Sequence, residues 1–267
     1  MQCLFCKGHS DHSISIEHIV PESLGNEDHI LPRGWVCDSC NNYFARKVEK
    51  PFLENHYAVE SRFRSMVSNK KGRYPVLRGM HLQSLSKIEL SYKDDDPRKG
   101  IEVDFSERSR SRLLDMKLGE KGTFIIPHVP EPCNDTTTAR FVAKTGLEVL
   151  AFRLKDVPGA NEELVGKPEL DKIRVYARRG QPQIVWPISL RRIYPEIFLF
   201  GDGSAPPYEV LHEFDILCAP GSEYYAVIAI FGWEYVINLG GPELDGYQEW
   251  LKKNNGRSPL YSGKNAN

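Results

Sequence analysis

Four cysteines near the start of the chain stand in two closely spaced pairs, Cys3 with Cys6 and Cys37 with Cys40. A Cys-x-x-Cys turn offers two thiolates to one ion, and two such turns fill the four positions of a tetrahedral Zn²⁺. Because all four ligands are cysteine, the zinc has no open position at which catalysis could occur. The pattern therefore predicts a structural zinc that stabilises a module too small to bury a secure core without it.

A second set of residue types suited to metal chemistry lies between and just after these pairs. Glu17 and His18 are adjacent in the segment "IEHIVPESLGN", and Asn41 directly follows the second cysteine pair. Carboxylate and amide oxygens bind hard cations such as Mg²⁺. An imidazole with a pKa of about 6.5 is largely neutral at pH 7, so it can accept a proton from water. Because the cysteine site is closed, catalysis by this module would use a second metal.

Together these residues resemble the HNH endonuclease family, the ββα-metal or His-Me finger nucleases, in the subgroup held together by a four-cysteine zinc. The resemblance covers about residues 3 to 55. It depends on the cysteine pairs, on an acidic residue followed by His with Pro three residues later, and on Asn after the second pair. It implies that His18 is the general base that activates the attacking water, and that Glu17 and Asn41 hold one catalytic Mg²⁺ or Mn²⁺. It also implies hydrolysis of phosphodiester bonds to 5′-phosphate and 3′-hydroxyl ends.

Each of these residues also has an ordinary structural interpretation. Glu17 and His18 could be an exposed pair at a strand end, with His18 hydrogen-bonded to a carbonyl. Asn41 could cap a helix, which asparagine does well. Asn42 could replace Asn41 in either role, because an error of one residue in the helix start exchanges them. His29 lies near the site in the sequence and could contact metal or phosphate.

The family's middle motif residue, an Asn that braces the loop in many members, has no clear counterpart. Its spacing falls near Leu31 and Pro32, and the nearest asparagine is Asn26. Three functions therefore stay open: a DNA endonuclease, a zinc-stabilised binding module that has lost catalysis, and a nuclease that prefers RNA. Because the nucleophile is water, only the binding groove would separate DNA from RNA.

The charge of the chain is unevenly distributed, which indicates where a nucleic acid would bind. The net charge is −1 overall, but residues 55–112 hold 13 basic and 8 acidic residues. Nucleic-acid affinity comes largely from neutralised phosphates, so this segment is the best candidate for a surface facing double-stranded DNA. A solvated basic face is the alternative. The predicted nucleic-acid contacts are Arg46, Lys47, Arg62, Arg64, Lys70, Lys71 and Arg73.

Hydrophobic patterning predicts an α+β protein, in which an N-terminal zinc-stapled ββα-metal module precedes a larger mixed α+β domain. The alternation over residues 13–16 indicates a short strand. Phe44, Val48 and Phe52 recur at helical spacing and predict a helix over residues 42–55, with a kink or break at Pro51.

The rest of the chain predicts further elements of both kinds. Short β-like runs occupy residues 74–106, a helical stripe covers 136–154, and strands are predicted at 172–178 and in a hairpin near Gly232. The expected organisation has four parts: the nuclease module (1–55), a basic β-rich connecting region (56–125), a C-terminal α+β domain (126–253) and a disordered tail (254–267).

Composition favours a cytoplasmic protein without a membrane partner. No run approaches the roughly 18 apolar residues of a membrane span, and the N-terminus lacks the pattern of a signal peptide. In a reducing compartment cysteines favour metal over disulfides, and the lone Cys133 and Cys218 are expected to be buried. The C-terminal domain is expected to bind a protein partner or a second copy of the chain. Stand-alone HNH proteins with an additional domain resemble effectors of bacterial restriction or antiviral defence, which is the expected biological role.

Overall fold

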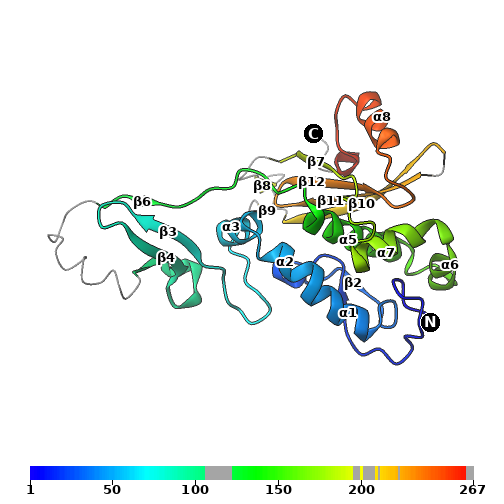
Figure 1. Cartoon of the computed structure of the whole chain (residues 1–267), viewed down its shortest axis with the longest axis horizontal. Helices are drawn as coiled ribbons and strands as arrows, with labels where there is room; N and C mark the ends of the chain where they lie inside the picture. The colour runs from blue at the N-terminus through cyan, green and yellow to red at the C-terminus, as the bar shows by residue number, and fades with distance from the viewer. Residues whose placement is uncertain (106–121, 195–198, 201–207, 210, 222, 263–267) are drawn as a thin grey trace. The chain divides into compact units, whose positions relative to one another are not determined.

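The computed structural model describes residues 1–105, 122–194, 199–200, 208–209, 211–221 and 223–262 (Figure 1). The chain divides into two compact units. One combines Met1–Phe52 with Cys133–Asn267, and the other is Leu53–Pro132. This division differs from the succession of modules expected from the sequence, because the N-terminal residues share one unit with the C-terminal part.

The N-terminal region has the order strand, strand, helix. Strand β1 (Glu17–His18) pairs antiparallel with β2 (Ile30–Leu31), so that Glu17 lies opposite Leu31 and His18 opposite Ile30. A short helical turn, η1 (Glu22–Leu24), lies between the two strands. The strand predicted at residues 13–16 is wrong. Ile14 and Ile16 are 76% and 49% exposed, so their alternation has no core to pack against.

A continuous helical segment follows the second cysteine pair. It consists of α1 (Asp38–Phe44), a π-helical turn η2 (Ala45–Glu49) and α2 (Lys50–Leu53). Phe44, Val48 and Phe52 are all buried, as predicted from their spacing. Pro51 lies inside the helix instead of ending it. Proline has no N–H and its ring crowds the carbonyl four residues earlier. The preceding turn is accordingly widened, and the Lys50 N–H bonds to the Ala45 carbonyl.

Helix α5 (Thr136–Leu154) forms over the predicted residues and is the centre of the first unit. On one side, the Phe141 ring stacks on Phe52 with 3.9 Å between ring centroids. On the other side, Gly146 lies against the C-terminal sheet, where an added Cβ would approach the Ala226 side chain to 2.9 Å. The glycine, which weakens a helix in isolation, is therefore needed for close helix–sheet packing.

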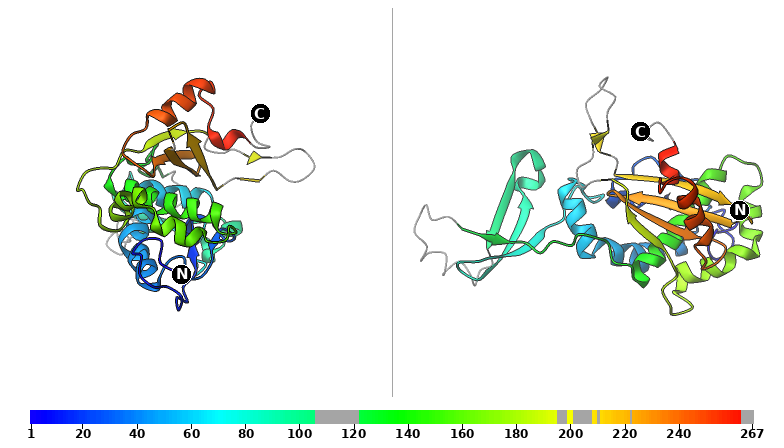
Figure 2. Two further views of the ribbon diagram at one scale, coloured as in Figure 1. Left: turned by 90° about the vertical axis from the view of Figure 1, so that its right-hand side faces the viewer. Right: turned by 90° about the horizontal axis from the view of Figure 1, so that it is seen from above.

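The sheet beside α5 is antiparallel with the order β10-β11-β12-β7 (Figures 1 and 2). Its strands are β7 (Ser189–Arg192), β10 (His212–Ala219), β11 (Glu223–Ile230) and β12 (Trp233–Asn238). The predicted hairpin is confirmed: β11 and β12 are joined by Phe231 and Gly232, both with positive φ, as a tight hairpin turn requires. Helix α8 (Asp245–Lys253) covers the face opposite α5, where Tyr247 packs on Tyr225 and Val227. A separate pair, β8 (Leu199–Phe200) and β9 (Tyr208–Glu209), is antiparallel.

Three short helical elements follow α5: α6 (Ala160–Gly166), η5 (Pro168–Leu170) and α7 (Asp171–Arg179). The strand predicted at residues 172–178 is therefore wrong. Ile173, Tyr176 and Ala177 are buried at i, i+3 and i+4, which is one face of a helix. A run this short fits either period, and packing in the unit selects the helix.

The second unit is a helix beside a sheet. Helix α3 (His56–Arg64) precedes β3 (Leu77–His81), β4 (Ser86–Tyr92), β5 (Ile101–Phe105) and β6 (Phe124–Ile125), in the sheet order β5-β4-β3-β6. Two 3₁₀ turns, η3 (Lys93–Asp95) and η4 (Pro97–Lys99), connect β4 to β5. The strands predicted within residues 74–106 are confirmed. Phe63, Leu77, Leu90 and Tyr92 form the core.

Two minor expectations are also corrected. Cys133 and Cys218 are both exposed, not buried. The end of the chain takes a defined path as far as η6 (Pro259–Ser262), since Ser258 is buried and its hydroxyl bonds to Glu234; residues 263–267 lie outside the described range. In the described part of the chain, every helix is too short or too polar to cross a bilayer.

Candidate metal centres and active site

The four paired cysteines converge on one point. Their Sγ atoms all lie within 4.8 Å of one another, and those of Cys6 and Cys37 are 3.7 Å apart. Tetrahedral zinc with bonds of about 2.3 Å separates its sulfurs by about 3.8 Å, so the cluster fits such an ion. A hydrogen bond from Cys40 lowers the pKa of Cys3 to about 4, which favours the thiolate that a metal requires.

Backbone groups orient these thiolates. The Cys37 N–H points to the Cys3 Sγ at 3.3 Å, and the Cys40 N–H points to the Cys37 Sγ at 3.4 Å. Cys37 is thereby the N-cap of α1, so the cysteine cluster fixes where this helix begins. The turn between Cys3 and Cys6 is also held by the C-terminal part of the unit. There the buried Arg174 guanidinium donates to the Leu4 carbonyl at 2.8 Å.

Glu17 and His18 lie on opposite sides of β1. Neighbouring residues of a regular strand point to opposite faces. The Glu17 side chain is buried, while His18 is partly exposed. The structure thus separates two side chains that the family resemblance places around one cation.

The Glu17 carboxylate belongs to a buried ionic network centred on Lys144 of α5. The Lys144 Nζ lies 2.6 Å from Glu17, 2.7 Å from Glu49 and 2.8 Å from Glu148. Burial opposes the charge on Lys144, but Glu148, Glu17 and Glu49 outweigh it and hold the pKa of Lys144 well above its usual range. Burial also raises the pKa of Glu148 and of Glu17. Lys144, Glu49 and Glu148 were not among the predicted site residues, because nothing in their local sequence links them to Glu17.

One face of helix α1 holds the segment that leads into β1. The Asp38 carboxylate accepts hydrogen bonds from the N–H groups of Ile14 and Ser15 and from the Ser15 hydroxyl, and these bonds lower the pKa of Asp38. One helical turn later, the Asn41 Nδ2 donates to the Ile16 carbonyl at 3.1 Å. Asn41 therefore lies at the edge of the strand that carries His18.

These contacts decide between the roles left open for the two asparagines. Asn41 is not a helix cap, because α1 begins at Asp38 and Cys37 caps it. Asn42 is exposed, and as the next residue of the helix it lies on a different face from Asn41. With Nδ2 turned to Ile16, the Asn41 Oδ1 has no hydrogen-bond donor among the described residues, so Asn41 stays the candidate ligand for a cation.

Asn26 performs the bracing for which the sequence analysis found no clear residue. Its buried side chain donates to the carbonyls of Val20 and His29 at 2.7 and 3.0 Å, and accepts from the His29 N–H at 2.9 Å. These bonds close the loop between β1 and β2.

His29 does not join this constellation. Its ring packs edge-on against Phe152 and Phe214, and its Nδ1 lies 3.4 Å from the Nε2 of His212. Burial lowers the pKa of His29, and burial together with His29 lowers the pKa of His212 to about 4. Both rings are neutral at pH 7 and link the loop before β2 to strand β10.

The predicted nucleic-acid contacts differ in exposure. Arg46 and Lys47 are exposed on the first unit. In the second unit, Arg62 is only 8% exposed, which leaves it unable to present its guanidinium to a phosphate. Arg64 is exposed but its Nη2 lies 2.6 Å from the Glu60 carboxylate. The remaining three, Lys70, Lys71 and Arg73, are exposed on one tight turn.

Asn69 shapes this basic turn. Its Oδ1 accepts from the N–H groups of Lys71 and Arg73, and its own N–H donates to the Arg73 carbonyl at 2.8 Å. Gly72 takes a φ of +73° there. The three basic side chains thus lie on a turn that is held by hydrogen bonds between Asn69 and the turn's own backbone.

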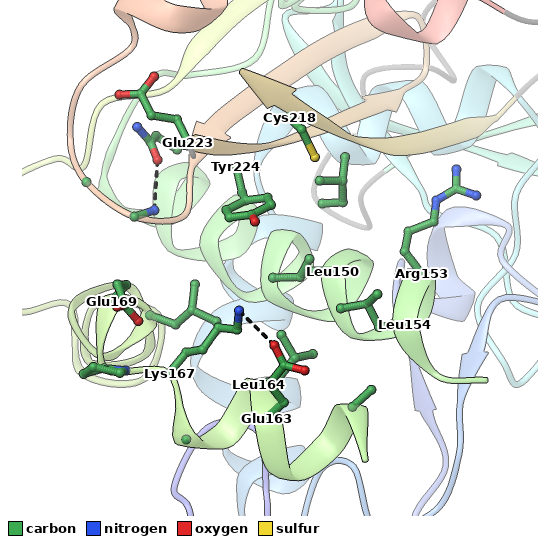
Figure 3. A pocket seen from close by; sticks show the side chains of 18 of the residues that line it. Leu150, Arg153, Leu154, Glu163, Leu164, Lys167, Glu169, Cys218, Glu223 and Tyr224 are labelled. Atoms are coloured by element: carbon green, nitrogen blue, oxygen red, sulfur yellow. Dashed lines mark hydrogen bonds and ion pairs between the residues drawn. The ribbon is translucent and has the colours of Figure 1, made fainter. Parts of the chain in front are cut away.

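A cavity of about 1180 Å³ lies apart from these residues, between α5, the α6–η5 segment and strands β10 and β11 (Figure 3). Leu150, Leu154 and Leu164 form an apolar wall, and the Lys167–Glu163 ion pair spans 3.1 Å at its side. None of the residues that the resemblance assigns to catalysis lines this cavity. The candidate active site is therefore the region around the partly exposed His18, which lies outside this cavity.

Comparison with known proteins identifies the N-terminal region. Residues 3–57 match the family model described as HNH endonuclease. No curated protein and no solved structure matches the chain. The matched segment contains the cysteine cluster, both strands and the helix described above. Residues 3–57 of this chain are therefore similar in sequence to the HNH endonuclease family.

Proposed function

We propose that this protein is a metal-dependent endonuclease that hydrolyses DNA phosphodiester bonds, with His18 as the general base. The observation that carries the proposal is the outward direction of His18 on β1, next to the edge where Asn41 of α1 lies. A partly exposed imidazole at an open surface can reach a water beside a backbone phosphate. Asn26 supports the catalytic interpretation over an inactive module, because the loop bracing that the inactive alternative assumed to be missing is present.

For the metals, we propose Zn²⁺ in the cysteine cluster and Mg²⁺ or Mn²⁺ at the Asn41 Oδ1. The family resemblance adds Glu17 to the catalytic cation, but its carboxylate is held by Lys144. The hard cations keep several waters and bind phosphate oxygens, so few protein ligands suffice. When bound, the cation would stabilise negative charge on the phosphate and the leaving 3′ oxygen.

For the substrate, we propose double-stranded DNA. Each unit has exposed cations that can contact phosphates: Arg46 and Lys47 on the first unit, and the basic turn on the second. The contacts are to phosphates, which supports affinity without sequence specificity. We extend the proposal to bacterial restriction or antiviral defence, by analogy with stand-alone HNH proteins. Phage plating on cells that express the wild type or His18→Ala tests that role.

Digestion of supercoiled plasmid tests the activity. Purified wild type is incubated with Mg²⁺ or Mn²⁺, beside the variant His18→Ala and the control variant His9→Ala. His9 is an exposed histidine just after the first cysteine pair. We expect His18→Ala to lower the cleavage rate by about 10²- to 10⁴-fold, the range for loss of a general base, and His9→Ala to leave it unchanged. Equal rates for wild type and His18→Ala, or no cleavage by either, would refute the proposal. Single-stranded RNA in parallel reactions tests the alternative substrate.

A further inference from the structure

We propose that Lys144 is a positioning residue for the nuclease site, and that Glu17 anchors strand β1 to it instead of binding the catalytic cation. This inference rests on the proposed function, because it assigns how that site is held. Lys144 lies 127 residues after Glu17 in the chain, on helix α5 and outside the matched HNH segment.

The contacts of Lys144 occupy its whole ammonium group. The side chain is fully buried, and its Nζ lies within 2.8 Å of one carboxylate oxygen from each of Glu17, Glu49 and Glu148. The same nitrogen is 3.5 Å from the backbone carbonyl of His18. These partners come from β1, the π-helical turn and α5, so one cation joins all three elements.

A divalent cation at Glu17 would have to enter this network. Lys144 already supplies the positive charge that the Glu17 carboxylate faces, and a second cation there would meet a buried ammonium. Removing one member of a buried ion pair typically costs about 3 to 5 kcal/mol, because the remaining charge is left without compensation. The geometry therefore favours Lys144 as the permanent partner of Glu17.

The contacts of Lys144 also complete a set of interactions that holds residues 14–18 in place. Asp38 holds the N–H groups of residues 14 and 15, and Asn41 holds the carbonyl of Ile16. Lys144 then holds the side chain of Glu17 and approaches the carbonyl of His18. Each residue from 14 to 18 is thus fixed by one of these three side chains. Since Glu17 is held on the inner face, the imidazole of His18 is directed outward.

The first test separates anchoring from metal binding. Glu17→Gln keeps an oxygen that can accept from Lys144 but removes the negative charge. Mn²⁺ affinity is measured by electron paramagnetic resonance of the free ion, which does not depend on cleavage. We expect Glu17→Gln to bind Mn²⁺ within about twofold of wild type, and Asn41→Ala to bind it at least about tenfold more weakly, the usual effect of disturbing a metal site. Weakening of about tenfold or more in Glu17→Gln would overturn the inference.

The second test removes the ammonium. In the triple variant Glu17→Gln/Lys144→Met/Glu148→Leu, the ammonium and its two most buried carboxylates all become uncharged. Replacing buried ion partners together is tolerated far better than removing one of them. We expect a folded protein whose cleavage rate falls by about 10- to 100-fold at unchanged Mn²⁺ half-saturation. The His18 imidazole resonances, assigned with His18→Gln, should shift. Unchanged His18 resonances together with a wild-type rate would overturn the inference.

A matched control uses another i,i+4 pair, Glu163 and Lys167, which lies beside the cavity between α5 and α6. Glu163→Leu/Lys167→Met should leave the His18 resonances and the cleavage rate unchanged, and a shift there would show that the effect is not specific to Lys144. If the wild type cleaves no substrate, the proposed function fails, but the Mn²⁺ affinity and the His18 resonances still decide whether Glu17 anchors or ligates.

Discussion

At the scale of single residues, the neighbours Glu17 and His18 have different roles. Glu17 faces inward and binds Lys144, while His18 faces outward to the solvent side. Asn41 holds the same segment through its amide nitrogen, and its amide oxygen is the proposed cation ligand. The chemistry of the site thus depends on which face of a two-residue strand each side chain occupies.

Asn26 gives the first prediction at this scale. Asn26→Ala removes three hydrogen bonds to buried backbone groups, and each group left unpaired costs about 1 to 3 kcal/mol. We expect lower stability in urea denaturation and a slower cleavage rate, because the loop between β1 and β2 loses its brace. The exposed Asn42→Ala is the control. A variant as stable and as active as wild type would show that Asn26 has no bracing role.

The cysteine cluster gives a second prediction. Elemental mass spectrometry should find one zinc per wild-type chain, and Cys37→Ser should lose it together with much of the thermal stability. Structural zinc contributes about 10 to 16 kcal/mol of apparent binding energy in zinc-finger peptides. Cys218→Ser, a change at an exposed cysteine outside the cluster, should keep the metal. Zinc content that survives Cys37→Ser would contradict the assignment.

At the scale of elements, the helix from α1 to α2 shows how short-range chemistry and packing combine. The cysteine cluster sets its first residue, and Pro51 widens the turn before it. That widened turn contains Glu49, whose carboxylate reaches Lys144. The π-helical turn is therefore part of the ionic network that holds β1 in the candidate active site.

The basic turn of the second unit carries a prediction at this scale. Lys70→Glu/Lys71→Glu reverses two exposed charges without touching the hydrogen bonds that Asn69 makes to the backbone. We expect weaker DNA binding and a flatter dependence on salt, because each lost phosphate contact lowers the slope by about 0.9. Fluorescence anisotropy over a salt series measures both.

Lys252→Glu/Lys253→Glu is the matched control, because it reverses two exposed charges on α8. It should leave the salt slope as in wild type. An unchanged slope in the Lys70 and Lys71 variant would dismiss the basic turn as a binding surface.

At the scale of the whole molecule, the segment that matches the HNH family model packs against the C-terminal part of its unit. Helix α5 provides Phe141 against Phe52 and Lys144 against Glu17, and Arg140 reaches the Tyr43 hydroxyl at 3.1 Å. Arg174 of α7 holds the Leu4 carbonyl. The HNH segment therefore shares its core with residues that are more than eighty positions away.

A truncation prediction follows from this shared core. Residues 1–57 alone should fail to fold even with zinc, since Phe52 and Glu17 would lose their buried partners. A chain in which a flexible linker replaces the second unit, residues 53–132, should retain the fold of the first unit, because that unit has its own core. Circular dichroism and zinc content measure both. A folded, zinc-bound 1–57 fragment would refute the shared core.

The sequence by itself determined the features that depend on local spacing. Two cysteine turns specify a four-thiolate cluster, and apolar residues at helical intervals predict helices over residues 42–55 and 136–154, because these signals need only neighbours in the chain. The first of these helices is observed at residues 38–53. Tertiary structure decided the rest. It turned Ile14 and Ile16 to solvent and made residues 171–179 a helix. It also buried Arg62 and brought Lys144 to Glu17, since burial and long-range ion pairing arise only when distant segments pack together.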